Sequence, residues 1–271
     1  MSGDCDAILC EDVSCVFEHV SGQRVEALRG VTTAFPPGEF ACIVGRSGHG
    51  KSTLLRAIAG LTPLSRGSII VAGRPVTGPS DERGMVFQED SVFPWMRVQE
   101  NAEFGLKAQG VGTSERRRIA DEWLTAVGLE EFAESWPREL SGGMRQRVAI
   151  ATVFAGGAKI LLMDEPFGAL DYVTRLSLHD LVLDLWRRTR RTILFVTHDI
   201  EEALILGDRI LVMRDGQIVD DLSVTLARPR DEEVRARSEA VHLTKTIVRH
   251  LGLRQGPLAA SDASSEEMTQ Q

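Results

Sequence analysis

The stretch EFACIVGRSGHGKSTLLRAIAG, residues 39–60, decides the fold of this chain. Its first part, EFACIV, is a compact apolar run, which predicts a buried strand. The next part, GRSGHGKS at residues 45–52, matches the pattern G-x-x-x-x-G-K-[ST]. KSTLLRAIA, residues 51–59, then predicts a helix that Gly60 and Pro63 stop. A glycine loop between a strand and a helix cradles phosphate groups, so the sequence predicts a nucleotide-phosphate loop here.

The residues of this loop are expected to have separate roles in binding phosphate and Mg²⁺. Its glycines let backbone N–H groups turn toward phosphate oxygens, and the helix N-terminus adds a partial positive charge. Lys51 is predicted to reach the β- and γ-phosphates, and the hydroxyl of Ser52 to bind Mg²⁺. His49 stands at a free position of the pattern and is interpreted as a filler without a catalytic role. The predicted contacts to ATP from the loop are Gly45, Arg46, Ser47, Gly48, His49, Gly50, Lys51, Ser52 and Thr53.

An acidic pair ends another apolar run, ILLMDEP at residues 160–166. In an open α/β sheet, ligands bind at the carboxyl ends of the strands. Asp164 is therefore predicted to hold Mg²⁺ through its water shell, and Glu165 to orient or deprotonate the attacking water.

Two more polar residues end apolar runs in the same way. Gln88 closes GMVFQ and is predicted to sense Mg²⁺ and the attacking water. His198 closes TILFVTH and is predicted to donate a hydrogen bond to the γ-phosphate, the alternative being a cap for the helix that starts near Asp199. The predicted catalytic set is thus Glu165, His198, Gln88 and Lys51, and the predicted metal set is Ser52, Gln88 and Asp164.

A second glycine-rich turn opens a predicted helix at LSGGMRQR, residues 140–147. The chain has one lysine-bearing loop and one Asp–Glu strand end, so a second nucleotide in the same chain has no partner residues. The economical interpretation is that this turn closes over the nucleotide bound to a second copy of the chain. Ser141 and the N–H groups of Gly142 and Gly143 would then contact the γ-phosphate across a C2 dimer interface.

Strand and helix patterns alternate on both sides of a helix-rich stretch. VSCVF and VEALRGVTTAF predict an N-terminal antiparallel β part, and residues 99–155 predict mostly helices. The fold class is therefore α/β: a mostly parallel sheet flanked by helices, with an inserted helical subdomain. The predicted boundaries are 1–88 and 159–228 for the nucleotide-binding core, 89–158 for the helical subdomain, and 229–271 for one amphipathic helix followed by a disordered tail.

Composition narrows the possible partners. The 271 residues carry a net charge of −8, which argues against a broad nucleic-acid surface but leaves room for a local basic patch. No apolar run approaches the roughly 20 residues of a membrane helix. The acidic first residues do not predict a secretory signal, so a cytosolic chain is expected. Cys5, Cys10 and Cys15 lack metal-ligand spacing and are interpreted as reduced thiols.

Six motifs stand in one order over about residues 10–225: GRSGHGKS, VFQED, LSGGMRQR, ILLMDEP, GALD and VTHD. In this order they resemble the ATP-binding subunits of ABC transporters, which have a P-loop NTPase core. The resemblance implies that Phe17 stacks on adenine, that Asp171 helps the two ATP sites communicate, and that Gln88 couples to the membrane subunit. An ordinary core position is the alternative for Phe17.

EDSVFPWMRVQENAEFGL, residues 89–106, is similar to the branch of this family that serves nitrate, sulfonate, taurine and bicarbonate importers. In that branch Phe93, Pro94 and Trp95 would help form the groove for a coupling helix of the transmembrane permease. The alternative is that Phe93 and Trp95 pack inside the helical subdomain.

The resemblance implies an ATPase that energises an importer. As a homodimer with ATP and Mg²⁺, it would act on permease subunits at the cytoplasmic face of the inner (plasma) membrane, with a solute-binding protein in the same system. The alternative is a soluble non-transport ABC ATPase, for example one of iron–sulfur assembly. No motif identifies the cargo, which does not contact this subunit.

Overall fold

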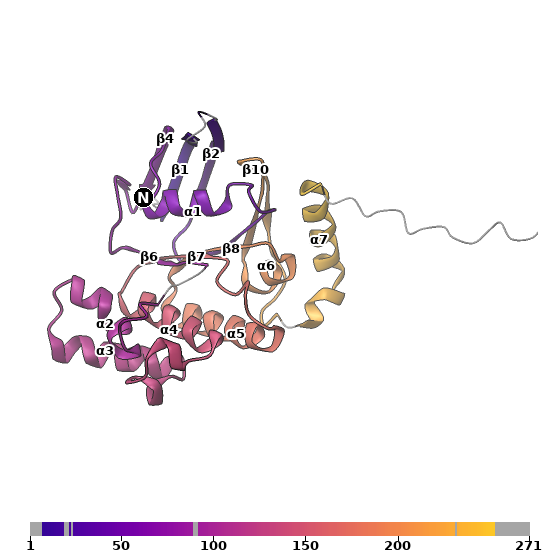
Figure 1. Cartoon of the computed structure of the whole chain (residues 1–271). Coiled ribbons are helices and arrows are strands. Elements are labelled where there is room, and N and C mark those ends of the chain that lie inside the picture. The colour runs from indigo at the N-terminus through magenta and orange to yellow at the C-terminus, as the bar shows by residue number, and fades with distance from the viewer. Residues whose placement is uncertain (1–6, 19–21, 23, 89–91, 231, 253–271) are drawn as a thin grey trace, which may run out of the picture.

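The computed structural model describes residues 7–18, 22, 24–88, 92–230 and 232–252 (Figure 1). Its strands form a four-stranded antiparallel sheet, in the order β2-β1-β4-β5, and a six-stranded sheet, in the order β10-β9-β3-β8-β7-β6. The strands are β1 (Ile8–Glu18), β2 (Arg24–Phe35), β3 (Phe40–Val44), β4 (Arg66–Val71), β5 (Arg74–Pro75), β6 (Arg83–Val86), β7 (Ile160–Asp164), β8 (Thr192–Thr197), β9 (Arg209–Arg214) and β10 (Gln217–Ser223).

The six-stranded sheet is mostly parallel, as the alternating pattern predicts. β3 pairs in parallel with β8 and β9, β8 with β7, and β7 with β6, while β10 joins β9 antiparallel. Every residue of β3, β7 and β8 is buried. Continuous apolar strands of this kind belong to a sheet that is covered on both faces.

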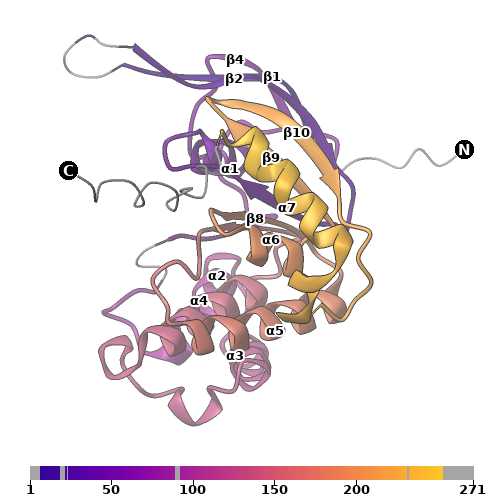
Figure 2. The ribbon, with the colours of Figure 1, turned by 90° about the vertical axis from the view of Figure 1, so that its right-hand side faces the viewer.

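Different layers cover the two faces (Figures 1 and 2). α1 (Lys51–Ala59) and the antiparallel sheet pack on one face, and the remaining helices lie on the other. Those helices are α2 (Val98–Ala108), α3 (Thr113–Ala126), α4 (Gly142–Ala155), α5 (Tyr172–Thr189), α6 (Ile200–Leu206) and α7 (Ser238–His250), with short 3-10 helices η1 (Glu130–Phe132), η2 (Pro137–Glu139) and η3 (Glu232–Ala236). Figure 2 shows α7 along the β9–β10 edge.

Alternating side chains of the central strand divide between the two layers. Phe40, Cys42 and Val44 belong to the apolar cluster shared with the larger helical layer. Ala41 and Ile43 belong to the cluster under α1 and the antiparallel sheet. The predicted domain boundaries remain predictions, because the first cluster runs without interruption from the sheet into α2, α3 and α4.

Two sequence-based predictions of element ends are wrong. Gln88 does not end a strand, because β6 ends at Val86. The pairing of β6 with β7 stops there, at Val86 opposite Met163. The predicted C-terminal amphipathic helix is present as α7 but starts only at Ser238. η3 ends at Ala236, and Arg237, with ψ 133°, is extended, so α7 starts a new helix at Ser238.

Some predictions concern residues outside the described ones. The predicted disordered tail, Cys5 and the last two residues of VFQED lie there. Cys10, Cys15 and Cys42 are described and buried. Among the described helices, none is both long and apolar enough to cross a bilayer.

Candidate functional site

Three neighbouring strands bring the predicted site together. β8 lies between β3 and β7, and all three run parallel. Their carboxyl ends therefore meet at one edge of the sheet, which is where ligands bind in open α/β sheets. The glycine loop follows β3, Glu165 follows β7 and His198 follows β8.

The loop after β3 has the backbone that its glycines permit. Gly50 has φ 93°, and a Cβ atom there would lie 2.4 Å from the carbonyl oxygen of Ala27. Gly50 is also the N-cap of α1, and it supplies no side-chain hydrogen bond to the first turn. The first N–H groups of α1 therefore keep their capacity for an anion such as phosphate.

His49 braces this loop from the side. Its Nδ1 atom lies 3.4 Å from the carbonyl oxygen of Met213, and its Nε2 atom lies 3.8 Å from Asp215. The ring therefore contacts the β9–β10 turn. This placement agrees with the interpretation that His49 has no catalytic part.

Lys51 points into its own loop. Its side chain is 4% exposed, and Nζ donates to the carbonyl oxygens of Gly45 at 2.9 Å and Arg46 at 3.2 Å. Nζ also lies 3.4 Å from Oε1 of Glu165. A buried ammonium group needs anionic or strongly polar partners, and phosphate oxygens are suited to this place.

Glu165 occupies a strained backbone position between two predicted catalytic residues. Its φ is +43°, a region that costs a non-glycine residue about 1–3 kcal/mol and recurs at functional sites. Its N–H donates to the carbonyl oxygen of Val196 at 3.0 Å, which ties it to β8. Oε2 lies 2.9 Å from Nδ1 of His198, so Lys51, Glu165 and His198 form one chain of contacts.

His198 is not the cap of the helix that follows it. The N-cap of α6 is Asp199, whose side chain accepts from the N–H groups of Glu201 and Glu202. The His198 side chain is 60% exposed and turns to Glu165. This geometry favours the functional alternative over the cap.

Ser52 and Asp164 fit a hard divalent cation. The Ser52 hydroxyl donates to Oδ1 of Asp164 at 2.7 Å, although 112 residues separate them in sequence. Asp164 is 1% exposed, and burial raises the pKa of its carboxyl above the usual value. A desolvated carboxylate beside a hydroxyl supplies the oxygen ligands that Mg²⁺ prefers.

Gln88 makes no described hydrogen bond or ion pair with Lys51, Glu165 or His198. It is exposed and lines a cavity of about 510 Å³ together with Gly142, Arg145 and Pro166. No described hydrogen bond joins it to Ser52 or Asp164. Its predicted catalytic and metal roles therefore stay predictions, and its place favours contact between the core and the helical layer.

The second glycine turn packs against the start of α5. Ser141 is the N-cap of α4, and its hydroxyl accepts from the N–H of Met144 at 3.3 Å. A Cβ atom on Gly143 would lie 2.5 Å from the methyl group of Thr174, so Gly143 permits close approach of the two helices. Asp171 caps α5 through Thr174, a local role that its motif did not predict. No described hydrogen bond joins this turn to the Lys51 loop.

The segment Phe93, Pro94 and Trp95, here called the FPW segment, is held by a residue that the sequence did not predict. This residue is Asn101, which is 1% exposed. Its side chain accepts from the N–H of Phe93 at 2.7 Å and donates to the carbonyl oxygens of Phe93, Met96 and Arg97. A buried asparagine in an otherwise amphipathic helix is the signal that would have revealed it.

The aromatic side chains of this segment are exposed to different degrees. Phe93 packs on Phe104 at a ring distance of 4.5 Å, as the packing alternative expects. Trp95 is 68% exposed, which does not fit that alternative. Phe17 is 46% exposed and is not an ordinary core residue either.

The fold and the Lys51–Glu165–His198 arrangement define a P-loop nucleotide-binding protein. The sequence profile described as ABC transporter matches residues 28–168. The nitrate import ATP-binding protein NrtD of Synechocystis sp. is 51% identical over 82% of this chain and 83% of its own length. The taurine import ATP-binding protein TauB of Rhizobium johnstonii is 48% identical over 84% of this chain and 88% of its own length.

A solved structure supports the same family. The dimeric ATP-binding cassette MJ0796, in a post-hydrolysis state bound to ADP and Pi, superimposes with a TM-score of 0.73 at 32% identity, over 81% of this chain and 100% of that one. This chain belongs to the ABC transporter family of ATP-binding proteins, and it is an ABC ATPase. These relatives do not favour the alternative of a soluble non-transport ATPase.

Proposed function

We propose that this chain hydrolyses ATP at the edge formed by β3, β8 and β7, and thereby energises import of a small solute. The observation that carries the proposal is the unbroken line of contacts from Lys51 through Glu165 to His198. These contacts support roles for the Lys51 ammonium in binding phosphate, for the Glu165 carboxylate as a base, and for the His198 imidazole beside it. The names of NrtD and TauB support nitrate or taurine, or a similar small solute, as the cargo.

In this mechanism Lys51 and the loop N–H groups hold the β- and γ-phosphates of ATP. Glu165 orients or deprotonates the attacking water, and its carboxylate is well placed to do so because Lys51 and His198 hold its two oxygens. His198 would keep Glu165 in this orientation and donate to the γ-phosphate. Phe17 supplies an exposed aromatic face for adenine.

Ser52 and Asp164 would hold Mg²⁺, with Gln88 as a further oxygen ligand. When bound, the ion would neutralise charge on the transferring phosphoryl group. The chain contributes the hydroxyl–carboxylate pair, which is already formed at 2.7 Å.

A second copy of the chain would complete each ATP site through Ser141, Gly142 and Gly143, with Asp171 beside them. The dimeric state of MJ0796 supports such pairing. Ser141 and the α4 N-terminus supply donors for a γ-phosphate. ATP would then stabilise the dimer, and hydrolysis would release it.

Phe93, Pro94 and Trp95 would contact the permease at the cytoplasmic face of the membrane. Support comes from the exposed Trp95 ring and from Asn101, which holds the backbone of this segment in one conformation. An exposed aromatic side chain on a rigid loop is typical of a protein-binding surface.

A pull-down from detergent-solubilised native membranes tests the function. Tagged Glu165→Gln protein, loaded with Mg²⁺ and ATP, should retain a polytopic permease and with it a solute-binding protein, identified by mass spectrometry. The same preparation with Trp95→Ala should lose the permease. Retention of soluble or ribosomal proteins without a permease would overturn the importer assignment and leave the ATPase.

A further inference from the structure

The helix that follows His198 is too short to hold itself in place. α6 (Ile200–Leu206) has seven residues, and isolated helices shorter than about 12 residues are marginal in water. It is buried almost throughout, from Glu202 to Leu206. Its position, and with it the position of His198, therefore depends on contacts from the rest of the chain.

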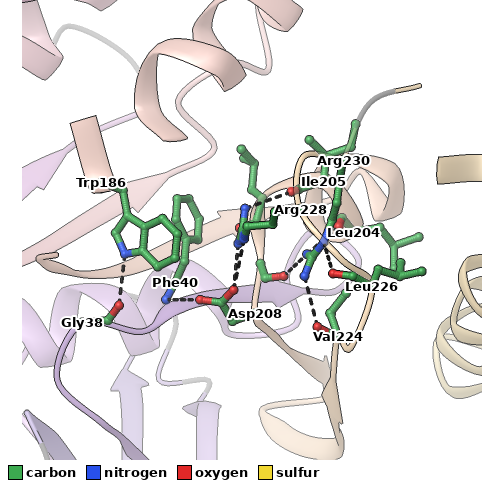
Figure 3. A network of polar contacts seen from close by, with 12 residues as sticks. Gly38, Phe40, Trp186, Leu204, Ile205, Asp208, Val224, Leu226, Arg228 and Arg230 are labelled. Carbon is green, nitrogen blue, oxygen red and sulfur yellow. Dashed lines mark hydrogen bonds and ion pairs between the residues drawn. The ribbon is translucent and has the colours of Figure 1, made fainter. Parts of the chain in front are cut away.

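Two arginines beyond β10 bind the end of this helix. The last carbonyl groups of a helix have no partner inside it. In α6 and its cap these are the carbonyls of residues 204–207, and all of them accept from a guanidinium group (Figure 3). Arg230 contacts the carbonyls of Leu204 and Gly207, and Arg228 contacts those of Ile205 and Leu206.

Arg230 is the more buried of the two, at 6% exposure. Its remaining donors go to the carbonyl oxygens of Leu226 at 2.9 Å and Val224 at 3.1 Å. Burial lowers the pKa of its guanidinium to about 10, so the group stays charged at neutral pH. A buried cation that faces carbonyl oxygens at a helix C-terminus is stabilised by the negative end of the helix dipole.

Arg228 connects the same helix end to the central strand. Its Nη2 atom lies 2.9 Å from Oδ1 of Asp208, and Oδ2 of Asp208 accepts from the N–H of Phe40, the first residue of β3. The guanidinium also lies 4.8 Å from the ring centre of Trp186 (Figure 3). The arginine thus fixes α6 relative to β3, the strand that leads to the phosphate loop.

The other parts of α6 are held as well. Asp199 caps its first turn, and Glu202 contacts His179 of α5 at 2.7 Å in a buried pair. The helix is therefore fixed at its start, middle and end. The start is next to His198, and the end depends on the two arginines.

We propose that Arg230, together with Arg228, is a positioning residue for His198, acting through α6. This inference rests on the proposed role of His198 in hydrolysis. Without the arginines, four carbonyl groups would lose charged partners, and α6 would shift or fray. His198 would then lose its fixed distance to Glu165, while the Lys51 loop, which lies on another element, would keep its nucleotide contacts.

The test compares Arg230→Gln and Arg230→Lys in the full chain with Mg²⁺ and ATP. The kcat of Arg230→Gln should fall by between about tenfold and a hundredfold, as expected for displaced catalytic geometry. KM and the affinity for ATP should stay within about twofold. Arg230→Lys keeps a cation for the carbonyls, so it should recover part of the loss.

The matched control is Arg209→Gln. Arg209 is also mostly buried, and it binds Asp221 and the carbonyl oxygen of Ala34 without a described contact to α6. Arg209→Gln should lower the melting temperature, but it should not lower kcat at an unchanged KM. An equal kcat loss in the control at unchanged KM would show that lost stability is enough, and the inference would fall.

An NMR measurement reads the position of His198 without using activity. The ring signal of His198 is identified by its loss in His198→Ala. In Arg230→Gln it should shift or broaden, and an unchanged signal would overturn the inference. If Arg230→Gln does not fold, Arg228→Gln carries the same measurements with the same outcomes.

His198→Ala separates this inference from the proposed function. If His198→Ala hydrolyses ATP at the normal rate, the role of His198 is wrong, whereas the NMR signal still decides whether Arg230 positions it. If His198→Ala is slow but Arg230→Gln is normal, the positioning inference alone is wrong.

Discussion

At the scale of single residues, the site contains groups in energetically unfavourable surroundings: a strained backbone and buried charges. Glu165 has a backbone conformation that glycine favours, and Asp164 is a carboxyl group almost without contact to water. Lys51 is a buried ammonium group. Such features cost stability in the folded chain, and phosphate and a cation would compensate the buried charges of Lys51 and Asp164.

Replacement of Asp164 by Asn tests this cost. Burial raises the pKa of Asp164 in the folded chain above its ordinary 3.8. The folded state therefore keeps the proton to higher pH than the unfolded state, so stability falls as pH rises through the interval that starts near 3.8. Above that interval the charged carboxylate remains a cost that Asn removes.

Without ligands at pH 7, Asp164→Asn should therefore raise the melting temperature, by about 2–4 °C if about 1 kcal/mol is relieved. The gain should shrink toward pH 3. Addition of Mg²⁺ and ATP should stabilise Asp164→Asn less than the unchanged chain. Thermal scans across pH measure both effects. A gain in melting temperature from Asp164→Asn that is smaller at pH 7 than at pH 3 would contradict the argument.

At the scale of elements, strand order explains which predicted residues meet. The apolar runs predict β3, β7 and β8 individually, and their motifs predict a site at strand ends. Their adjacency is a property of the sheet, since β8 comes between β3 and β7 although it follows both in sequence. The same scale explains Gln88, because β6 ends two residues before it and leaves it at the cavity beside Gly142.

Asn101→Ala tests how an element presents the FPW segment. The change removes the hydrogen bonds that Asn101 makes with the backbone of Phe93, Met96 and Arg97. The free energy of unfolding should fall by about 1–3 kcal/mol, which is the cost of leaving buried polar groups unpaired. ATP hydrolysis by the isolated chain should stay within about twofold, because the Lys51–Glu165–His198 contacts lie elsewhere. Retention of the permease in the pull-down should be lost.

Gln99→Ala is the matched control for Asn101. Gln99 is a buried amide on the same helix that bonds to Glu103 and to the carbonyl oxygen of Arg117. It should cost similar stability and retain the permease. Equal loss of the permease in both variants would mean that destabilisation of α2, rather than the shape of the FPW segment, is responsible.

At the scale of the whole molecule, one chain carries two glycine-rich turns that are proposed to bind phosphate, and no described hydrogen bond joins them. The Lys51 loop lies at the edge of the parallel sheet, and the Ser141 turn lies at the start of α4, against α5. In the proposed C2 dimer, each ATP site would use the Lys51 loop of one copy and the Ser141 turn of the other. ATP shifts such an equilibrium only through its higher affinity for the closed dimer, which the Ser141 contacts would supply.

Glu165→Gln should make this dimer visible. The amide cannot act as a base, so bound ATP persists, and gel filtration with Mg²⁺ and ATP should show a dimer that is absent without nucleotide. Lys51→Ala in the Glu165→Gln background removes the phosphate-binding ammonium and should return the profile to the monomer. A Glu165→Gln profile that ATP leaves unchanged, at a concentration where ATP is bound, would contradict the composite site.

The amino-acid sequence by itself determined the fold class and the family of this protein. Local spacing predicts α1 at the bounds that the structure has, and the order of six motifs identifies the family. Helix periodicity, glycine turns and phosphate loops are local properties, so a sequence pattern can carry them. Tertiary structure alone decided that Glu165 touches both Lys51 and His198, that Asn101 holds the FPW segment, and that Arg228 and Arg230 bind the end of α6. Those contacts join residues far apart in the chain, and they depend on strand order and on the direction of buried side chains, neither of which a local pattern encodes.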